Sequence, residues 1–401
     1  MDKAYELSRE EAGRFLLRRH GLWGAYRFHQ KEGVMGFIRM AGCIQYDPID
    51  VCGKNPELVL QSRVEGFQKP MLYELLYKER RLVDYFDKNL SIFAVEDWKY
   101  FERIRLRHRE WERSHQEIRR VEAQVKEYIC KHGPVCSGDL GLDEKVNWYW
   151  SHTKLSRAAL EHLYFTGELA IHHKKGTNKY YDLIENCFPM DLLNQEDPYP
   201  DEYQHKKWRV LRRIRSIGLL WSRSSDAWLN INGLKGEERK RIFSELEQEN
   251  KILQVHVDGI REPLYFPAED LELMEEIRRG TRCKKRCELI APLDNLLWDR
   301  RLIAGIFGFE YKWEIYTPPQ QRRYGYYVLP VLYGASFAGR LEAVCDRKKS
   351  ILRIPGIWFE PGFQPDSAFM AAFVSRLKQF AQWNGCQGVE GPEGYKKFFD
   401  P

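Results

Sequence analysis

Two polar residues with complementary chemistry stand close together in residues 40–63, the stretch MAGCIQYDPIDVCGKNPELVLQSR. Gln45 and Asp47 are separated by one residue and have mostly apolar neighbours. An ionised Asp47 can accept a proton from a water molecule or stabilise a developing positive charge. The Gln45 amide can donate and accept hydrogen bonds, so it can orient that water. The two residues therefore form a candidate catalytic pair.

The pair offers one carboxylate and no evident acid partner, which favours a leaving group that needs no protonation. A base made cationic by alkylation is such a group. Its N-glycosidic bond breaks with oxocarbenium character at the sugar, which a nearby carboxylate stabilises, and the base departs neutral. The alternative is a structural role, in which Asp47 caps the next turn and Gln45 bonds nearby backbone.

The neighbouring residues predict how the pair is positioned. In an extended segment the period of two places Gln45 and Asp47 on one face, about 7 Å apart. Pro48 biases Asp47 away from the helical region, so the carboxylate is expected at the end of a strand or in a tight connection. One helix should end at Gly42, and Asn55 is expected to cap the next. The pair is then held on a connector between two helices.

A succession of helices followed by paired strands recurs three times and predicts winged-helix domains at residues 1–117, 118–195 and 196–282. Apolar spacing and end signals place helices at residues 8–20, 34–41, 55–62, 71–79, 121–132, 137–140, 153–165, 208–217 and 237–250. Paired strands are expected at 80–94, 169–183 and 252–267, the last with Asp258 and Gly259 as a type I′ turn.

The sequence pattern changes from residue 283. Short β-rich runs at 311–318, 325–334, 336–346 and 350–360 predict a small sheet or barrel. A helix is expected at 299–307, and a final amphipathic helix should begin at its cap, Asp366. The predicted fold class is α+β, with three tandem winged-helix domains and a small β-barrel with a terminal helix at 283–401.

The charge of the chain is compatible with a polyanionic partner. Lysine and arginine outnumber aspartate and glutamate by 64 to 58, which gives a net charge of +6. Solvated helix faces are the alternative explanation for any one basic cluster. The residues that we expect to contact DNA phosphates are Lys174, Lys175 and Lys179 at a hairpin tip, and Arg212, Arg213, Arg322 and Arg323.

Nothing in the sequence predicts a membrane segment or a bound cofactor. No run of 18 apolar residues occurs, and the N-terminus MDKAYELSREEAG lacks a signal-peptide core, so we expect a cytoplasmic protein. Nine scattered cysteines suit a reducing compartment. Cys283 and Cys287, with His256 the nearest histidine, make a weak case for zinc. We therefore expect no metal and no organic cofactor.

Several motifs resemble the AlkZ-like superfamily of winged-helix DNA glycosylases. They are GCIQYDPIDV followed by ELVLQSR, PLDNLLWDRRLIAGIFGFEYKWEIYTP, and RRYGYYVLPVLYG followed by GRLEA. The resemblance spans nearly the whole chain. The Gln-x-Asp form carried by Gln45 and Asp47 is similar to the AlkX (YcaQ) branch, whereas the AlkZ branch carries Gln-x-Gln.

This resemblance implies three winged helices and a β-barrel arranged in a C-shape around a duplex-sized concave face. It also implies hydrolysis of N-alkylpurine nucleotides in double-stranded DNA, including the unhooking of interstrand crosslinks in DNA repair, with Gln45 and Asp47 as the catalytic pair. A base tied to the opposite strand cannot rotate fully out of the duplex, so we expect an open, shallow cleft at Asp47.

Two other functions fit parts of the sequence. A non-enzymatic winged-helix regulator would explain a DNA-binding fold, but it has no reason to aim a carboxylate at DNA. A nuclease needs several acidic metal ligands; Asp47 and Asp50 are candidates and a third is missing. Lyase chemistry needs an activated amine, and nothing near Lys54 activates it, so we expect a monofunctional hydrolase. We expect a monomer, because no dimerisation helix is evident.

Overall fold

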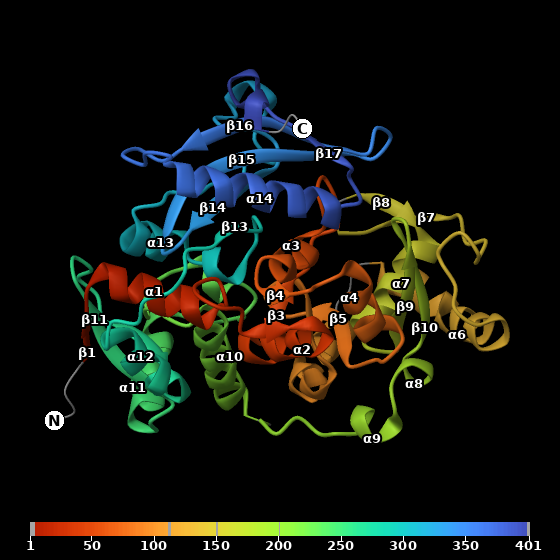
Figure 1. The fold of residues 1–401 in the computed structure, drawn as a ribbon. Helices are drawn as coiled ribbons and strands as arrows, with labels where there is room; N and C mark the ends of the chain where they lie inside the picture. The colour runs from red at the N-terminus through yellow and green to blue at the C-terminus, as the bar shows by residue number, and fades with distance from the viewer. Residues whose placement is uncertain (1–4, 111–113, 150, 200, 399–401) are drawn as a thin grey trace. The chain divides into compact units, whose positions relative to one another are not determined.

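A computed structural model describes residues 5–110, 114–149, 151–199 and 201–398 (Figure 1). The chain divides into two compact units, residues 1–72 with 206–401, and residues 73–205. The division falls inside two helices, α4 (Lys69–Tyr77) and α10 (Glu202–Ile217). Helices and sheets are mixed, which confirms the α+β class. The number of winged-helix domains, their boundaries and the C-shape stay predictions.

The start of the first N-terminal helix and the end of the second lie where the sequence signals them, although the second begins four residues before the expected start at residue 34. Helix α1 (Arg9–Arg19) starts with a capping box, in which the Glu11 N–H donates to Ser8 Oγ at 3.2 Å and Glu11 Oε2 accepts from the Ser8 N–H at 2.8 Å. Helix α2 (Gln30–Ala41) ends at Gly42, whose φ of 78° favours glycine. Strand β3 (Cys43–Gln45) follows directly.

The next helix, α3 (Asn55–Gln61), corrects one prediction. Its N-cap is Lys54, whose N–H donates to Glu57 Oε2 at 3.1 Å, so Asn55 is the first helical residue and not the cap. The reason is that the Asn55 side chain is used elsewhere, in the connection that carries Gln45. Ser62 is the C-cap, as expected.

A three-stranded sheet lies at one end of the first unit. Strand β11 (Ile252–Val257) pairs in parallel with β1 (Tyr5–Leu7) and antiparallel with β12 (Leu264–Pro267). The predicted hairpin is present, but the type I′ turn is wrong. Such a turn needs positive φ at both central residues, and Asp258 does not have it; its N–H donates instead to the Leu7 carbonyl of β1 at 3.0 Å.

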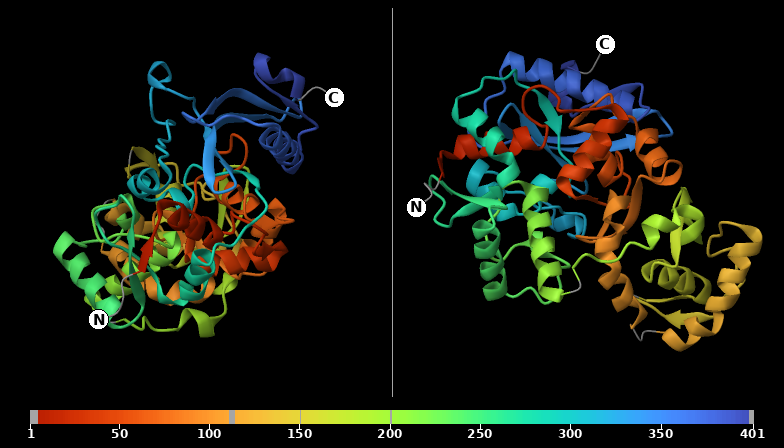
Figure 2. Two further views of the ribbon diagram at one scale, coloured as in Figure 1. Left: turned by 60° about the vertical axis from the view of Figure 1, so that its left-hand side comes forward. Right: turned by 90° about the horizontal axis from the view of Figure 1, so that it is seen from below.

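The C-terminal part of the first unit is built on a five-stranded sheet. Its order is β13 (Cys287–Leu289), β14 (Val328–Tyr333), β15 (Ser336–Asp346), β16 (Ile351–Phe359) and β17 (Gly388–Glu390), antiparallel except for β16 with β17. Helix α14 (Ser367–Trp383) lies along this sheet (Figures 1 and 2) and is capped by Asp366, as predicted. In the part of the chain that is described, β13 and β17 are edge strands. The sheet is therefore open and not a closed barrel.

Residues 311–318 were expected to form a strand and do not. Tyr311 donates its hydroxyl to the Val328 carbonyl at 2.8 Å, and the Glu314 carboxylate accepts main-chain N–H groups of the 322–326 loop. The segment therefore supports a loop through these contacts. Within the described residues it pairs with no strand. The predicted helix at 299–307 is α13 (Arg300–Phe307), with Asp299 as its N-cap.

The second unit contains the predicted strand pair and hairpin. Strand β5 (Leu82–Phe86) pairs with β6 (Leu90–Ala94), and β9 (Leu169–Lys175) pairs with β10 (Asn178–Leu183). Helix α6 (His115–His132) ends at Gly133 and packs on α7 (Leu155–Phe165). Residues 137–140 form a turn and not a helix, because Asp139 Oδ2 accepts from the Cys136 N–H at 2.7 Å.

The remaining elements are short or connect those above. They are β2 (Phe28–His29), β4 (Val64–Glu65), η1 (Val95–Phe101), α5 (Glu102–Arg109), β7 (Lys145–Asn147), β8 (His152–Lys154), α8 (Ile184–Cys187), α9 (Met190–Leu193), η2 (Asp226–Trp228), α11 (Gly236–Gln248), η3 (Ala268–Asp270), α12 (Leu271–Arg278), η4 (Asn295–Leu297), η5 (Pro319–Gln321) and η6 (Glu393–Phe398). Among the described residues, no helix combines the length and the apolar character needed to cross a bilayer. None of the nine cysteines, all of which the structure describes, forms a disulfide.

Candidate functional site

Gln45 is the last residue of β3, and Asp47 lies two positions further on in an irregular connection. The expected place of the carboxylate, just beyond a strand, is therefore confirmed. The two side chains differ in exposure: Gln45 is 7% exposed, whereas Asp47 is half-buried. Asp47 is thus the member of the pair that solvent reaches more readily.

The main chain leading to Asp47 is fixed by side chains from three other elements. Four carbonyls of residues 41–45 each accept a hydrogen bond from a distant side chain. The donors are Ser216 to Ala41, Arg212 to Gly42 at 2.7 Å, Asn295 to Cys43 at 2.8 Å and Asn55 to Gln45 at 2.8 Å. All four donors are buried, so these bonds are shielded from water. The main chain that leads into the connection is therefore fixed by buried side chains from elsewhere in the first unit.

Asn55 and the segment after β13 support this connection together. Asn55 Oδ1 accepts from the Leu293 N–H at 3.0 Å while its Nδ2 donates to the Gln45 carbonyl, so one amide bridges two segments. The neighbouring Asp294 pairs with Arg63 at 2.5 Å, and both side chains are fully buried. The PLDN motif that carried part of the family resemblance is therefore structural.

The two carboxylate oxygens of Asp47 differ in their hydrogen bonding. Its Oδ1 accepts from the Ile49 N–H at 2.9 Å, the turn-capping bond of the structural alternative. Its Oδ2 has no hydrogen-bond partner in the described part of the chain. Burial raises the pKa of the Asp47 carboxyl, and the Ile49 bond partly opposes that rise. One oxygen orients the group, and the other can meet a water or a substrate.

Tyr327 is a buried acidic group whose pKa responds to the Asp47 charge. Burial raises the pKa of Tyr327 well above its usual range, and Cys52, Asp47 and Asp50 contribute to the rise. Asp50 is neutralised by Arg347, whose Nη2 lies 2.6 Å from Asp50 Oδ1. Asp50 therefore pairs with an arginine. In a nuclease, this carboxylate would instead have to bind a metal ion.

The hairpin lysines separate into one exposed and two sequestered residues. Lys174 is half-buried, but its side chain is only 8% exposed and its Nζ lies 3.0 Å from Asp84 Oδ2. Burial lowers the pKa of Lys179, which lies over the Tyr164 ring at 6.0 Å. Lys175 is exposed. Of the three expected phosphate contacts, Lys175 is the one that the structure places in solvent.

The four arginines also separate by burial. Arg212 and Arg213 are buried; Arg212 holds the Gly42 carbonyl, and Arg213 lies over the Trp298 ring at 5.6 Å. Both side chains are therefore enclosed by protein in this structure. Arg322 is half-buried and its Nε donates to the Thr317 carbonyl at 2.8 Å, whereas Arg323 is exposed.

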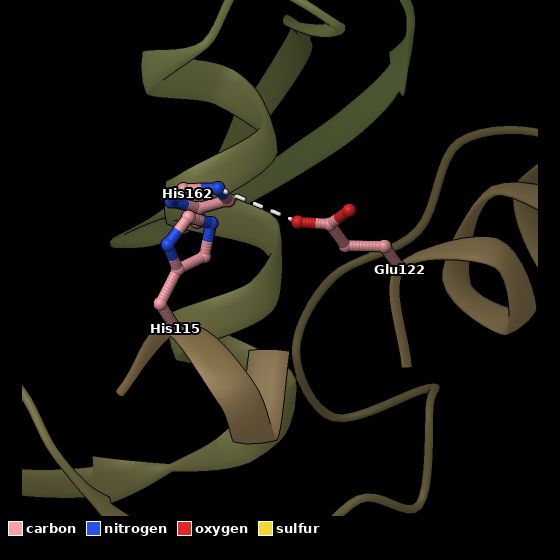
Figure 3. Close-up of side chains that lie close together, drawn as sticks. All are labelled: His115, Glu122 and His162. Atoms are coloured by element: carbon pink, nitrogen blue, oxygen red, sulfur yellow. Dashed lines mark ion pairs between the residues drawn. The ribbon is translucent and has the colours of Figure 1, made fainter. Parts of the chain in front are cut away.

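A second polar cluster was missed by sequence reasoning. His115 and Glu122 of α6 and His162 of α7 place their ligand atoms within 4.8 Å of one another (Figure 3). The available signal was a pair of polar residues inside an apolar stripe of α6. The weak zinc alternative at Cys283 gains no support, because this cluster is the one metal-competent group among the described residues.

The comparisons with known proteins agree on one family. A family model described as DNA glycosylase AlkZ-like matches residues 38–383, which include Gln45 and Asp47. Streptomyces sahachiroi DNA glycosylase AlkZ has a similar structure, with a TM-score of 0.64 and 13% sequence identity over 96% of this chain and 99% of that chain. At this identity the structural likeness shows a shared fold, and the family match covers most of the sequence. The chain belongs to the DNA glycosylase AlkZ-like family.

Proposed function

We propose that this protein is a monofunctional DNA glycosylase that hydrolyses the N-glycosidic bond of cationic N-alkylpurines, such as N7-alkylguanine, in double-stranded DNA. Asp47 is its catalytic carboxylate and Gln45 its partner. The observation that carries the proposal is the Asp47 side chain, half-buried on a fixed connection with one oxygen bonded to Ile49 and the other without a partner in the described residues. Such a group is oriented before substrate arrives.

The chemistry needs little else from the protein. An alkylated purine already carries a positive charge, so it leaves as a neutral base without an acid catalyst. The sugar gains oxocarbenium character, which the ionised Asp47 stabilises while it accepts a proton from the attacking water. The partly buried position strengthens this electrostatic effect, because fewer waters screen the carboxylate.

Gln45 contributes mainly through its position. Its carbonyl is fixed by Asn55, and its side chain is largely buried next to the Asp47 connection. An amide at this place can accept from and donate to the nucleophilic water and so restrict its direction of attack. We therefore assign Gln45 to water orientation and Asp47 to charge and proton transfer.

Lyase activity is not part of the proposal. Lys54, the amine nearest in sequence, is the N-cap of α3, where its main chain serves helix α3. A Schiff-base nucleophile requires an amine aimed at the sugar. The expected product is therefore an intact strand with an abasic site.

We also propose that the enzyme acts on interstrand crosslinks. A crosslinked base cannot leave the duplex completely, so Asp47 must act on a base that is only partly displaced. We propose that Lys175 and Arg323, both exposed, contact phosphates. The protein would act as a cytoplasmic monomer on DNA, in repair of alkylation damage.

The test is product analysis with purified full-length protein. Duplex DNA carrying 7-methylguanine is incubated with the protein in EDTA, and strands are then treated with alkali. The expected result is cleavage only after alkali, at the modified guanine. Cleavage before alkali would indicate a lyase. Binding without abasic sites would favour a non-enzymatic regulator, and strand breaks that appear only with Mg²⁺ would favour a nuclease.

A further inference from the structure

Helices α6 and α7 of the second unit bring three metal-ligand side chains together. His115 and Glu122 project from α6, and His162 projects from α7 toward both (Figure 3). Their ligand atoms all lie within 4.8 Å of one another. Two imidazoles and a carboxylate thus converge at one point of a helix pair.

The position of these residues in α6 is unusual for polar side chains. His115, Ile118, Glu122, Val125 and Ile129 follow one another by alternating steps of three and four, which is the spacing of one helix face. The three apolar members of this stripe are fully buried. A histidine and a glutamate within such a face cost desolvation energy unless each has a partner.

The donor set and its spacing match a small transition-metal ion. Zn²⁺ binds imidazole nitrogen and carboxylate oxygen at about 2.0–2.2 Å with tetrahedral angles, so its ligand atoms lie about 3.4 Å apart. Glu122 Oε1 and His162 Nε2 are already 3.4 Å apart. The ligand atom of His115 lies within 4.8 Å of the other two, so it must move closer to them to complete three corners.

We propose that His115, Glu122 and His162 bind one Zn²⁺ ion, with water as the fourth ligand, and that this ion links α6 to α7. The site is separate from Asp47, and its role is structural. The proposed glycosylase reaction therefore proceeds in EDTA, while the thermal stability of the protein depends on the metal.

One arginine competes with the ion. Arg119 Nε lies 2.9 Å from His115 Nε2 and donates to it. This bond keeps a positive charge beside the ligand and must open when metal binds. Arg119 is exposed, and with His115 it lines a cavity of about 790 Å³ through which an ion can arrive. Arg119 therefore lowers the affinity of the site without belonging to it.

The test measures zinc binding by the full-length protein after removal of metal with EDTA and dialysis. Titration with ZnSO₄ alone should show one site per chain, and the thermal midpoint should rise by roughly 5 °C at saturation. X-ray absorption at the zinc edge should show nitrogen and oxygen neighbours near 2.0 Å and no sulfur near 2.3 Å. A shell that contains sulfur would overturn the proposal, since it would place the ion on cysteines.

Variants identify the ligands. His115→Ala and Glu122→Gln should each weaken zinc binding by roughly a hundredfold or more and abolish the thermal shift. The matched controls on the same helix, His132→Ala and Glu117→Gln, should bind zinc like the unmodified protein. Both ligands are only half-buried, so these variants avoid the larger disturbance expected at buried His162. Equal zinc affinity in ligand and control variants would refute the site.

Arg119→Gln should change zinc affinity in the opposite direction to the ligand variants. Removing the competing guanidinium should strengthen zinc binding several-fold, because both the hydrogen bond and the like charge disappear. A weaker affinity in this variant would contradict the proposed geometry. Glycosylase activity in EDTA should be the same for all five variants, so loss of zinc binding and failure of the Asp47 proposal are separate outcomes.

Discussion

The Asp47 connection and the α6–α7 cluster are two polar sites that differ in how the chain assembles them. Gln45 and Asp47 are neighbours in sequence, and their main chain is fixed by Asn55, Asn295 and other buried donors. The metal cluster joins side chains that are far apart in the sequence, from His115 to His162, and few bonds fix it. The first site is preorganised, whereas the second is completed by its ligand.

The two sites differ in whether ligand binding must order the groups that it contacts. At the Asp47 connection the protein has already ordered the reacting group, so substrate binding need not order it. At the helix pair, an ion must open the Arg119 bond and draw His115 inward, and the resulting link stabilises the fold. Variants of the first site should therefore change rates, and variants of the second should change metal-dependent stability.

The largest expected effect on stability concerns the support behind the connection. Asp294→Asn removes the charge that neutralises fully buried Arg63, and it should lower the free energy of unfolding by about 3–5 kcal/mol. Chemical denaturation of purified protein measures this change. Asp258→Asn, at an exposed aspartate, is the matched control and should cost little. An equal small loss in both variants would mean that the ion pair is not a main support of the connection.

Asn55→Ala should have a smaller effect on stability and a distinct effect on rate. It removes the bridge between the Gln45 carbonyl and the Leu293 N–H, at a cost of about 2 kcal/mol. Because Asn55 positions the connection and does not touch the substrate, kcat should fall while KM changes little. Single-turnover base release at temperatures where the variant is folded measures this. Asn178→Ala, at an exposed asparagine, should behave like the unmodified protein.

The pH dependence of base release should report Asp47. Burial raises the pKa of this carboxyl, and the reaction needs its ionised form, so the rate should fall as pH drops through a value above the ordinary 3.9 or so. The same raised pKa means that the folded state holds this proton more tightly than the unfolded state. Asp47 therefore contributes stability at low pH that is lost as pH rises through its folded pKa. A rate that stays constant down to the ordinary range, after subtraction of spontaneous depurination, would argue against Asp47 as the base.

The smallest expected effects concern DNA affinity. Lys175→Ala and Arg323→Ala should each reduce the slope of log K against log salt by about 1, because each removes one phosphate contact. Lys174→Ala on the same hairpin should leave the slope unchanged, since that ammonium is buried against Asp84. Fluorescence anisotropy at several salt concentrations compares the three. An equal change in Lys174→Ala would mean that the hairpin rearranges on DNA.

The sequence predicted those features that depend on local signals. The Ser8 capping box, the end of α2 at Gly42 and the Asp366 cap were all visible, because each depends on a few adjacent residues. The place of Asp47 beyond β3 followed from Pro48. The Asn55 cap was wrong for a physical reason: a tertiary partner, Gln45, competes for the same side chain.

Features that depend on tertiary burial were not predictable in this way. Arg212, Arg213 and Lys174 look like phosphate ligands by charge, but the structure buries the two arginines and pairs the Lys174 ammonium with Asp84. Counting charges cannot separate a solvated cation from one that holds a carbonyl or a carboxylate. The α6–α7 cluster was missed because His162 comes from another helix, although the polar residues in the α6 stripe were visible.

The central claim is that the Asp47 carboxylate performs the chemistry on a connection that is already ordered. The most direct test is single-turnover release of 7-methylguanine by Asp47→Asn, measured beside Asp50→Asn and with DNA affinity and unfolding recorded for both. We expect a loss of roughly a hundredfold or more for Asp47→Asn with normal folding and binding, and a near-normal rate for Asp50→Asn. Near-normal release by Asp47→Asn would contradict the central claim.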